Sequence, residues 1–274
     1  MPVGPYRLPA AGRDLVLVRR GEALARVLWV EGEQVLVYAW AAGRAVRFRA
    51  EAASRGAASA GIERMRFALG TDHEVSEFHA RFKRDPLIGQ VVRARPWVRP
   101  RRRPEPFEAL AWAVCEQLIE SRRAASIERT IVRRHGRRSS CGCFVSPPAA
   151  ERLAGRAPAE LDACGLAPKR SIALIRAARE VASGRADLCR HEPSWRRLLK
   201  IPNIGNWTIE MLAFEGQGRD DMLPALDLAY VKLVGRLAGL GRRATEDEVR
   251  CFFAPYEEWA GLAGIYALQR RFTQ

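Results

Sequence analysis

The sequence predicts an α+β fold, in which an N-terminal antiparallel sheet with accompanying helices is followed by an all-helical region. Two observations carry this prediction. Short runs of β-branched and aromatic residues, punctuated by Gly, fill residues 1–55, and this pattern is typical of an antiparallel meander. From residue 57 onward the apolar residues recur at helical spacing, except in one stretch rich in Pro and Arg at 93–106.

The strands are expected close together, with a tight turn at Gly32 between the second and third of them. Their predicted ranges are Leu15–Val18, Ala25–Val30, Gln34–Trp40 and Ala45–Arg49. Helical spacing then appears over 57–69 and again over 74–82. We therefore expect residues 1–92 to form a small α+β domain.

Residues 93–106 contain four Pro and six Arg, a composition that excludes both a helix and a central strand. We expect a basic, extended connector here, either solvated or touching phosphates, and a helical domain over 107–274. Its predicted helices are one or two within 107–135, one that starts after Pro147-Pro148, then 169–183, 194–200, 206–214 and 228–240, one opened by a Thr245–Glu248 capping box, and 256–272.

The charge balance indicates a polyanionic partner. The chain has 46 Lys and Arg against 31 Asp and Glu, which gives a net charge of +15. Nucleic acid is the first candidate for such a surplus and an anionic membrane the second. No stretch approaches the roughly 18 apolar residues of a spanning helix, and the N-terminus lacks the apolar segment of a signal peptide. We expect a cytoplasmic protein without a membrane partner, whose six scattered Cys form no disulfides.

The most informative segment is a short turn between two apolar helical stretches. Pro202 ends the first stretch, Gly205 permits a positive φ, Asn203 tolerates the left-handed region, and Asn206 is a good N-cap. Such a turn leaves backbone N–H groups free at a helix N-terminus, where they can bind a phosphate without a charged side chain. A plain αα-hairpin is the alternative.

The turn resembles the hairpin of the helix-hairpin-helix DNA glycosylases, most closely that of the bacterial 3-methyladenine DNA glycosylase II branch. The family pattern is roughly L-x-x-(I/L)-P-G-(I/V)-G, one variable residue, and W-T-A. The matching residues are Leu198, Ile201, Pro202, Ile204, Gly205, Trp207 and Thr208. The chain departs from the pattern at Asn203, where Gly is usual, and at Ile209, where Ala is usual. The resemblance is strongest over 107–268 and implies an all-α helix-hairpin-helix glycosylase core.

The resemblance also implies that Asp227 is the catalytic carboxylate. The family places an Asp about twenty residues beyond the hairpin at a helix start, and Asp227 follows Gly205 by 22 positions, with Lys232 after it. Cleavage of an N-glycosidic bond develops positive charge on the deoxyribose, which a fixed carboxylate stabilises while orienting or deprotonating water. An N-cap Asp is the structural alternative, and the two roles can coexist.

Trp207 separates two kinds of relative. Strand-cutting glycosylases carry a Schiff-base Lys at this position, so Trp207 implies a monofunctional enzyme that leaves an abasic site. A Trp can also stack on an electron-poor base. Met211, Trp259 and Tyr266 are the other residues expected to bind the substrate base, with core packing as the alternative for Trp207 and for at least one of the last two.

The segment 107–119 resembles the family's F-E-x-(I/L)-x-x-x-I-x-x-Q-Q/L stretch, in which the residue that fills the gap in the base stack follows a Gln. Leu118 is then the wedge, although a lone Leu is as readily a core residue. The expected DNA-binding residues are Gln117, Leu118, Pro202, Asn203, Ile204, Gly205, Asn206 and Thr208. Near the C-terminus Glu257-Glu258 replaces the Arg-Ser that the family often has.

The resemblance implies no required cofactor. The main-chain carbonyls of Leu199, Ile201 and Ile204 would hold a monovalent cation. An iron–sulfur cluster is not expected, because four clustered Cys are required and Cys251 stands alone in the C-terminal part. Zinc is not expected either, because His135, Cys141 and Cys143 lack an evident fourth ligand.

The resemblance thus implies a monofunctional DNA glycosylase in base excision repair. It would flip alkylated purines such as 3-methyladenine out of double-stranded DNA and hydrolyse the N-glycosidic bond with Asp227, as a monomer on the cytoplasmic nucleoid. Two alternatives stay open. One is a glycosylase for deaminated or oxidised bases. Met211 keeps this alternative open, because a Met side chain in the wall of the base pocket adapts to more base shapes than an aromatic residue does. The other is a non-catalytic protein that uses the hairpin as a phosphate clamp.

Overall fold

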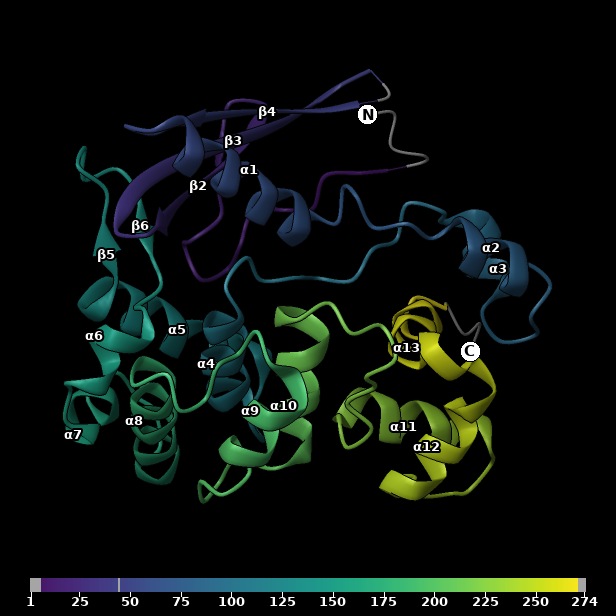
Figure 1. The fold of residues 1–274 in the computed structure, drawn as a ribbon. Helices are drawn as coiled ribbons and strands as arrows, with labels where there is room; N and C mark the ends of the chain where they lie inside the picture. The colour runs from purple at the N-terminus through teal and green to yellow at the C-terminus, as the bar shows by residue number, and fades with distance from the viewer. Residues whose placement is uncertain (1–5, 44, 271–274) are drawn as a thin grey trace.

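A computed structural model of the chain describes residues 6–43 and 45–270, with a sheet packed above a set of helices (Figure 1). Four strands pair antiparallel in the order β1-β2-β3-β4, which confirms the predicted meander. Their bounds are β1 Val18–Arg20, β2 Ala23–Val30, β3 Glu33–Ala42 and β4 Ala45–Glu51. In the central pair Val27 lies opposite Leu36, so both strands place β-branched and aliphatic side chains where they are buried.

Helix α1 (Arg55–Leu69) covers one face of the sheet. The Ser54 hydroxyl caps its N-terminus by accepting from the Ala57 N–H, and Gly70 ends it in the left-handed conformation. Met65 is fully buried and belongs to one apolar cluster with Leu24 and other side chains of the sheet.

The remaining helices form two groups that lie below the sheet and side by side (Figure 1). The first group contains α4 Pro106–Glu116, α5 Ser121–His135, α6 Ala150–Ala154, α7 Pro158–Asp162, α8 Pro168–Ala182, α9 His191–Leu198 and α10 Asn206–Met211, which continues as a π-turn at Leu212–Gly216. The second contains α11 Leu228–Leu237, α12 Glu246–Phe253, a 3-10 turn at Ala254–Trp259 and α13 Ala260–Leu268. Each group has its own cluster of buried apolar side chains.

Helices α2 (Ser76–Phe82) and α3 (Gly89–Ala94) belong to the sequence of the N-terminal part but pack against the second group. Phe78 lies 5.0 Å from Tyr266 between ring centroids, and Phe82 lies 5.8 Å from Trp259. The chain thus runs from the sheet to the C-terminal helices, and then returns along the connector at 95–105 to begin α4 (Figure 1).

The stretch predicted as one or two helices within 107–135 forms two, because it is broken after Glu116, where Leu118 has a positive φ of 51°. Other local features differ from the predictions. A two-residue hairpin, β5 Arg137–Arg138 with β6 Val145–Ser146, was not predicted, since its strands are too short to show a period. It is held to the large sheet by a hydrogen bond from the Trp29 indole N–H to Ser146 Oγ. The predicted last helix is a 3-10 turn followed by α13, and Phe272 lies outside the described residues.

The capping box of α12 is confirmed: Thr245 Oγ1 accepts from the Glu248 N–H, and the Glu248 carboxylate accepts from the Thr245 N–H. Among the helices of the described residues, none combines the length and the apolar character that crossing a bilayer requires.

Candidate active site

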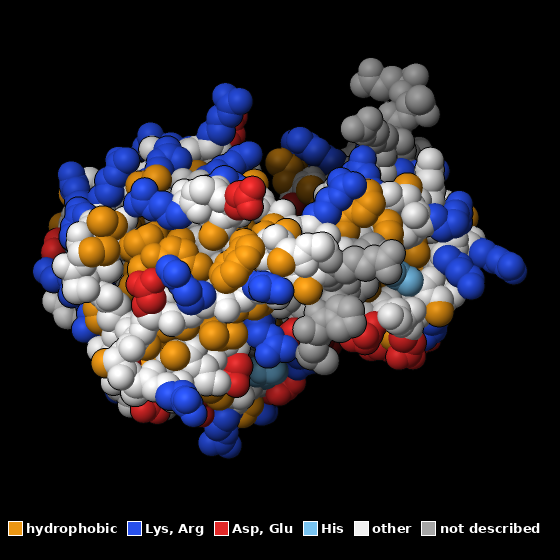
Figure 2. Space-filling model, turned by 90° about the horizontal axis from the view of Figure 1, so that it is seen from above, with side chains coloured by type: hydrophobic (Ala, Val, Ile, Leu, Met, Phe, Trp, Pro, Cys, Tyr) orange, Lys and Arg blue, Asp and Glu red, His pale blue; other side chains and the backbone are white. Residues whose placement is uncertain are grey.

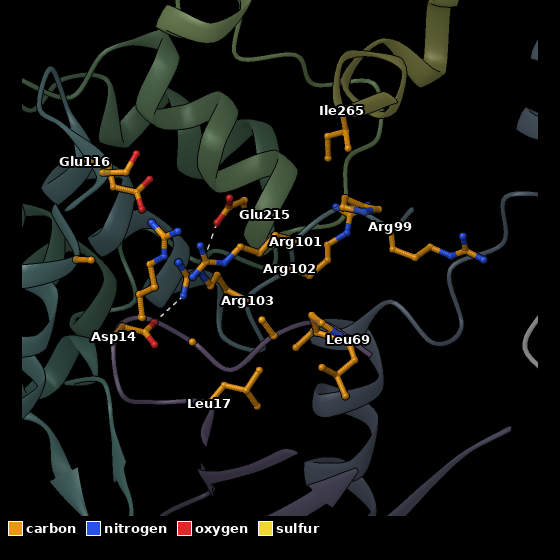
Figure 3. Close-up of a pocket in the computed structure, with 18 of the residues that line it drawn as sticks. Asp14, Leu17, Leu69, Arg99, Arg101, Arg102, Arg103, Glu116, Glu215 and Ile265 are labelled. Atoms are coloured by element: carbon orange, nitrogen blue, oxygen red, sulfur yellow. Dashed lines mark hydrogen bonds and ion pairs between the residues drawn. The ribbon is translucent and has the colours of Figure 1, made fainter. Parts of the chain in front are cut away.

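A cavity of about 1170 Å³ lies where the sheet, the connector and both helical groups meet (Figure 3). Its lining comes from segments far apart in the sequence. They include residues 6–14, the connector at 97–103, the start of α5, and the N-terminal ends of α10 and α11. Trp207 and Asp227 both line it, so the structure brings together two residues that sequence reasoning selected separately.

Asp227 is the N-cap of α11, and its Oδ1 accepts a hydrogen bond of 2.8 Å from the Ala229 N–H. The same carboxylate lines the cavity, and Lys232 lines it as well, on the same helix. The capping role and the cavity-facing role therefore coexist in one side chain. The neighbours Leu226 and Leu228 are about half exposed, at 50% and 49%, and form an apolar rim around this carboxylate.

Trp207 is the second residue of α10 and is partly buried. Its indole N–H is buried, and no acceptor among the described residues takes it. The indole N–H of Trp112, a fully buried core residue, is unpaired as well, so it is the position of Trp207 at the cavity that distinguishes this side chain.

Met211, Trp259 and Tyr266 lie elsewhere among the described residues and do not line this cavity. Tyr266 is fully buried; its hydroxyl lies 2.7 Å from His79 Nε2 and donates to the Val98 carbonyl at 3.0 Å. Trp259 packs beside Phe82 in the same aromatic cluster. The structure gives these two aromatic residues a packing role that joins α13 to α2, the alternative that the sequence left open.

The hairpin turn is anchored by apolar side chains and exposes its tip. Leu198, Ile201 and Ile204 are buried, whereas residues 202, 203, 205 and 206 are exposed. Asn203 adopts the left-handed conformation that its residue type was expected to tolerate, with φ 68°. Two details correct the prediction. Gly205 does not use a positive φ, since its φ of −112° and ψ of −177° are values that any residue can adopt. Gly205 is also the N-cap of α10, so Asn206 is the first residue of the helix.

Gly205 is not required by the packing of the protein itself. A Cβ built there would meet no atom within 4 Å. The first N–H groups of a helix have no partner within the helix, and at this turn they follow an exposed residue without a side chain. The turn therefore permits close approach of a ligand to the backbone.

Leu118 is completely exposed, at 105% of its reference area, which excludes the core alternative for this residue. Its loop is held rigidly from both sides. Gln117 Nε2 donates to the Asn203 carbonyl at 2.8 Å and lies 2.9 Å from Thr208 Oγ1, and Arg170 donates to the Gln117 carbonyl at 2.9 Å. These bonds couple the predicted wedge directly to the hairpin turn.

The carbonyls expected to hold a cation belong to the turn just before α10. The Ile201 carbonyl accepts from the Ile204 N–H at 3.0 Å and retains a second lone pair. Such neutral oxygen donors suit a monovalent ion better than a transition metal. Within residues 6–43 and 45–270, no group of three or more His, Cys, Asp or Glu side chains is arranged to hold a metal.

Buried ion pairs form one wall of the cavity, and the sequence did not reveal them. Arg103 reaches Asp14 at 2.9 Å and also Glu108 and Glu215 (Figure 3). Arg26 pairs with Glu108 from the sheet side. Burial alone would raise the pKa of Asp14, but these guanidinium groups hold that pKa below its usual range. From the sequence, the Arg side chains of the connector were expected to be solvated or to contact phosphates.

Arg102 anchors the connector to the loop that precedes Asp227. It is buried and pairs with Asp220 at 2.5 Å, and Asp220 in turn lies 2.6 Å from His73 Nε2. These contacts fix the loop that leads into Asp227 to the connector and to the turn after α1. The sequence offered little indication that Arg102 is buried, because an exposed and a buried Arg have the same appearance in a Pro-rich segment.

No family model matches the chain. It is 29% identical over 205 residues to the DNA-3-methyladenine glycosylase of Bacillus subtilis, a match that covers 71% of this chain and 67% of that protein. It is 30% identical over 167 residues to DNA-3-methyladenine glycosylase 2 of Escherichia coli, a match that covers 58% of each chain.

Solved structures show the same fold. A 3-methyladenine DNA glycosylase from Archaeoglobus fulgidus superposes with a TM-score of 0.79 at 21% identity, over 92% of this chain and 88% of that one. The 3-methyladenine DNA glycosylase of Schizosaccharomyces pombe, solved with abasic DNA, gives a TM-score of 0.60 at 25% identity, over 71% and 96% of the two chains.

Proposed function

We propose that this chain, a member of the helix-hairpin-helix DNA glycosylase superfamily in its bacterial 3-methyladenine branch, is a monofunctional DNA glycosylase that releases alkylated purines. One observation carries the proposal. A carboxylate (Asp227) and a partly buried indole with an unpaired N–H (Trp207) share one cavity, and Trp207 stands directly beside the hairpin and its attached wedge. The named relatives release 3-methyladenine by their printed names, which favours the same substrate class here.

The hairpin turn would bind a phosphate of the duplex with its main chain, since its exposed tip carries no charged side chain. The net charge of +15 supplies the longer-range attraction. Figure 2 shows Lys and Arg side chains spread widely over the face seen from above, with Asp and Glu much rarer.

Leu118 would enter the base stack where the damaged nucleotide leaves it. An apolar wedge stabilises the unstacked duplex, and an exposed Leu on a loop pinned by Gln117 and Arg170 is prepared for that task before DNA binds. The extruded base would then enter the cavity and stack on Trp207.

Asp227 would stabilise the positive charge that develops on the deoxyribose as the bond to the base breaks, and would orient the attacking water. An alkylated purine is a good leaving group, so no strong general acid is needed. No Lys stands at the Trp207 position for a Schiff base. Lys232 lines the cavity, however, so trapping with borohydride is the direct test of a lyase activity.

The proposed enzyme also has a bound cation, an oligomeric state and a place in the cell. The carbonyls of Leu199, Ile201 and Ile204 would hold a monovalent cation at the hairpin, and no other cofactor would be needed. The protein would act as a monomer on damaged duplex DNA of the nucleoid, in base excision repair. Division into parts at 1–92, 93–106 and 107–274 stays a proposal, since α2 and α3 pack with the C-terminal helices.

The deciding experiment is release of free bases from methylated duplex DNA by wild type, Asp227→Asn and the control Asp247→Asn, in which the lost charge is exposed on α12. We expect 3-methyladenine from wild type and the control alone, strand breaks only after alkali, and no borohydride adduct. Tight, salt-sensitive binding without release of any base would contradict the proposal and favour a binding protein. Release of only deaminated or oxidised bases would contradict the alkylpurine specificity.

A further inference from the structure

We propose that Glu116 and Glu128 form the part of the cavity that recognises the positive charge of an alkylated base, and that they are specificity-determining residues. This inference rests on the proposed function and adds to it a criterion for choosing substrates: a quaternised, cationic base is favoured over a neutral damaged base of similar shape.

Both carboxyl groups line the cavity that holds Trp207 and Asp227. Glu116 is the last residue of α4 and directly precedes Gln117 and the wedge. Its backbone is therefore fixed by the same contacts that hold the wedge to the hairpin, including the bond from Arg170 to the Gln117 carbonyl. A base that leaves the stack beside Leu118 would enter the cavity next to Glu116.

The two carboxyls have no direct ion pair, although Arg103 and Arg101 act on both from a greater distance. No Lys, Arg or His of the described residues comes within ion-pair distance of either one, whereas Asp14, Glu108 and Glu215 share the guanidinium of Arg103. Glu128 is only 3% exposed, and its buried Oε1 receives no hydrogen bond from any described N–H or hydroxyl group. A buried carboxylate in this condition is costly, so the pair is a feature that folding alone does not favour.

The ionisation of Glu116 depends on its surroundings in the cavity. Burial first, and then the carboxylates of Glu215 and Glu128, raise the pKa of Glu116 to about 8 against the opposing effect of Arg103 and Arg101. Burial likewise raises the pKa of Glu128. Glu116 therefore holds its proton at neutral pH, and a positive charge brought into the cavity would favour its ionised form.

A methylated ring nitrogen such as N3 of adenine gives the nucleotide a positive charge. When that base enters, it stabilises the ionised form of Glu116, and the proton of Glu116 passes to solvent. A neutral base such as hypoxanthine provides no such compensation. Release of a cationic base should therefore increase as the pH rises through the pKa of Glu116, and release of a neutral base should not.

The test compares the second-order rate constant for release of 3-methyladenine from methylated duplex DNA with that for release of hypoxanthine from a duplex containing deoxyinosine. Both are measured at enzyme concentrations below the Kd, so that entry of the base into the cavity contributes to the rate and the pH profile reports the free enzyme. The variants are Glu116→Gln, Glu128→Gln and the control Glu151→Gln, which removes an exposed acid on α6. We expect the Glu116 variant to release 3-methyladenine about tenfold more slowly, because the attraction between charges a few ångström apart is lost. Hypoxanthine release should change less than about twofold.

The pH profile of 3-methyladenine release is a second readout that needs no neutral substrate. Wild type should rise between about pH 6.5 and pH 9, whereas Glu116→Gln should be flat. Both Gln variants should fold, since removal of an unpaired buried acid lowers the cost of burial; a thermal melt checks this.

Three results would overturn the inference while leaving the proposed function intact. They are an equal loss of release rate for both bases, no loss for either base, and the same pH profile in wild type and Glu116→Gln. Failure of wild type to release any methylpurine would overturn both.

Discussion

The hairpin turn and the ionic wall of the cavity are built by opposite means. The turn carries no charged side chain at its tip and takes its shape from buried Leu198, Ile201 and Ile204. The wall is made of charged side chains, with Arg103 buried among Asp14, Glu108 and Glu215. Main-chain N–H groups suffice where a phosphate must be held regardless of sequence. At the wall, each buried charge instead depends on the charged partners around it.

The difference also predicts where substitutions cost stability. Charges at the wall are desolvated and depend on one another, whereas the exposed hairpin tip makes few contacts with the rest of the protein. Changes at the wall should therefore act on folding, and changes at the hairpin tip should act on DNA. Four experiments, in order of decreasing effect, test this division.

Arg103→Met should have the largest effect. It leaves three carboxylates at the wall without their shared cation, so the free energy of unfolding should fall by about 3–5 kcal/mol. Urea unfolding followed by Trp fluorescence measures it. Arg196→Met removes an exposed Arg from α9 and should cost less than about 0.5 kcal/mol. Similar losses of unfolding free energy in the two variants would show that a buried Arg at the wall contributes no more to stability than an exposed Arg.

Gly205→Asp should weaken duplex DNA binding by about tenfold or more, because a carboxylate would face the phosphate at the hairpin. Folding should be unaffected or slightly stabilised, since Asp is a favoured N-cap and a Cβ meets no atom within 4 Å. Fluorescence anisotropy and a thermal melt report the two effects, and Gly205→Ala isolates the steric part. A fall in melting temperature that matches the loss of affinity would mean that the glycine serves the fold.

Leu118→Ala should slow base release by about fivefold, since the gap left by the extruded base is no longer filled. Its stability should stay within about 0.5 kcal/mol of wild type, because the side chain is completely exposed. Ile172→Ala, another exposed apolar residue, on α8, is the matched control and should change neither quantity. Unchanged release would argue against a wedge at this position.

Glu180→Gln should have the smallest effect, below about 1 kcal/mol, because this ion pair on the hairpin side is partly exposed. Hydrogen bonds from Arg185 and Arg197 lower the pKa of Glu180 to about 2. The stabilisation is therefore present above its usual pKa of 4.5 and is lost as the pH falls toward 2. Unfolding curves of wild type and variant should converge in acid; a constant difference would contradict this.

Local structure was largely predictable from the sequence. Alternation and Gly turns placed β2, β3 and β4, and Thr245 with Glu248 placed the start of α12. Apolar spacing also identified the hairpin, because its anchors lie close together in the chain. The sequence offered both Asn203 and Gly205 for a positive φ, and only Asn203 uses it, because the tolerance of a residue type for a conformation does not show that the conformation is used.

Contacts between distant segments were not predictable. Nothing in the local pattern shows that Tyr266 packs against α2 or that Arg102 pairs with Asp220 across more than a hundred residues. Of the four residues expected at the base, Trp207 lines the cavity, while Met211, Trp259 and Tyr266 do not. An aromatic residue on a helix has the same appearance in sequence whether it faces a cavity or a neighbouring helix.

The sequence by itself determined the order of sheet and helices, the hairpin with its apolar anchors, and the carboxylate that follows it. These depend on propensity, periodicity and spacing, which are properties of short segments. Only the tertiary structure decided which Arg residues of the connector are buried, and that Glu116 and Glu128 face one cavity without a direct ion pair. The cost or value of a charge depends on the solvent and the partners around it, and these are set by segments that the chain brings together only when it folds.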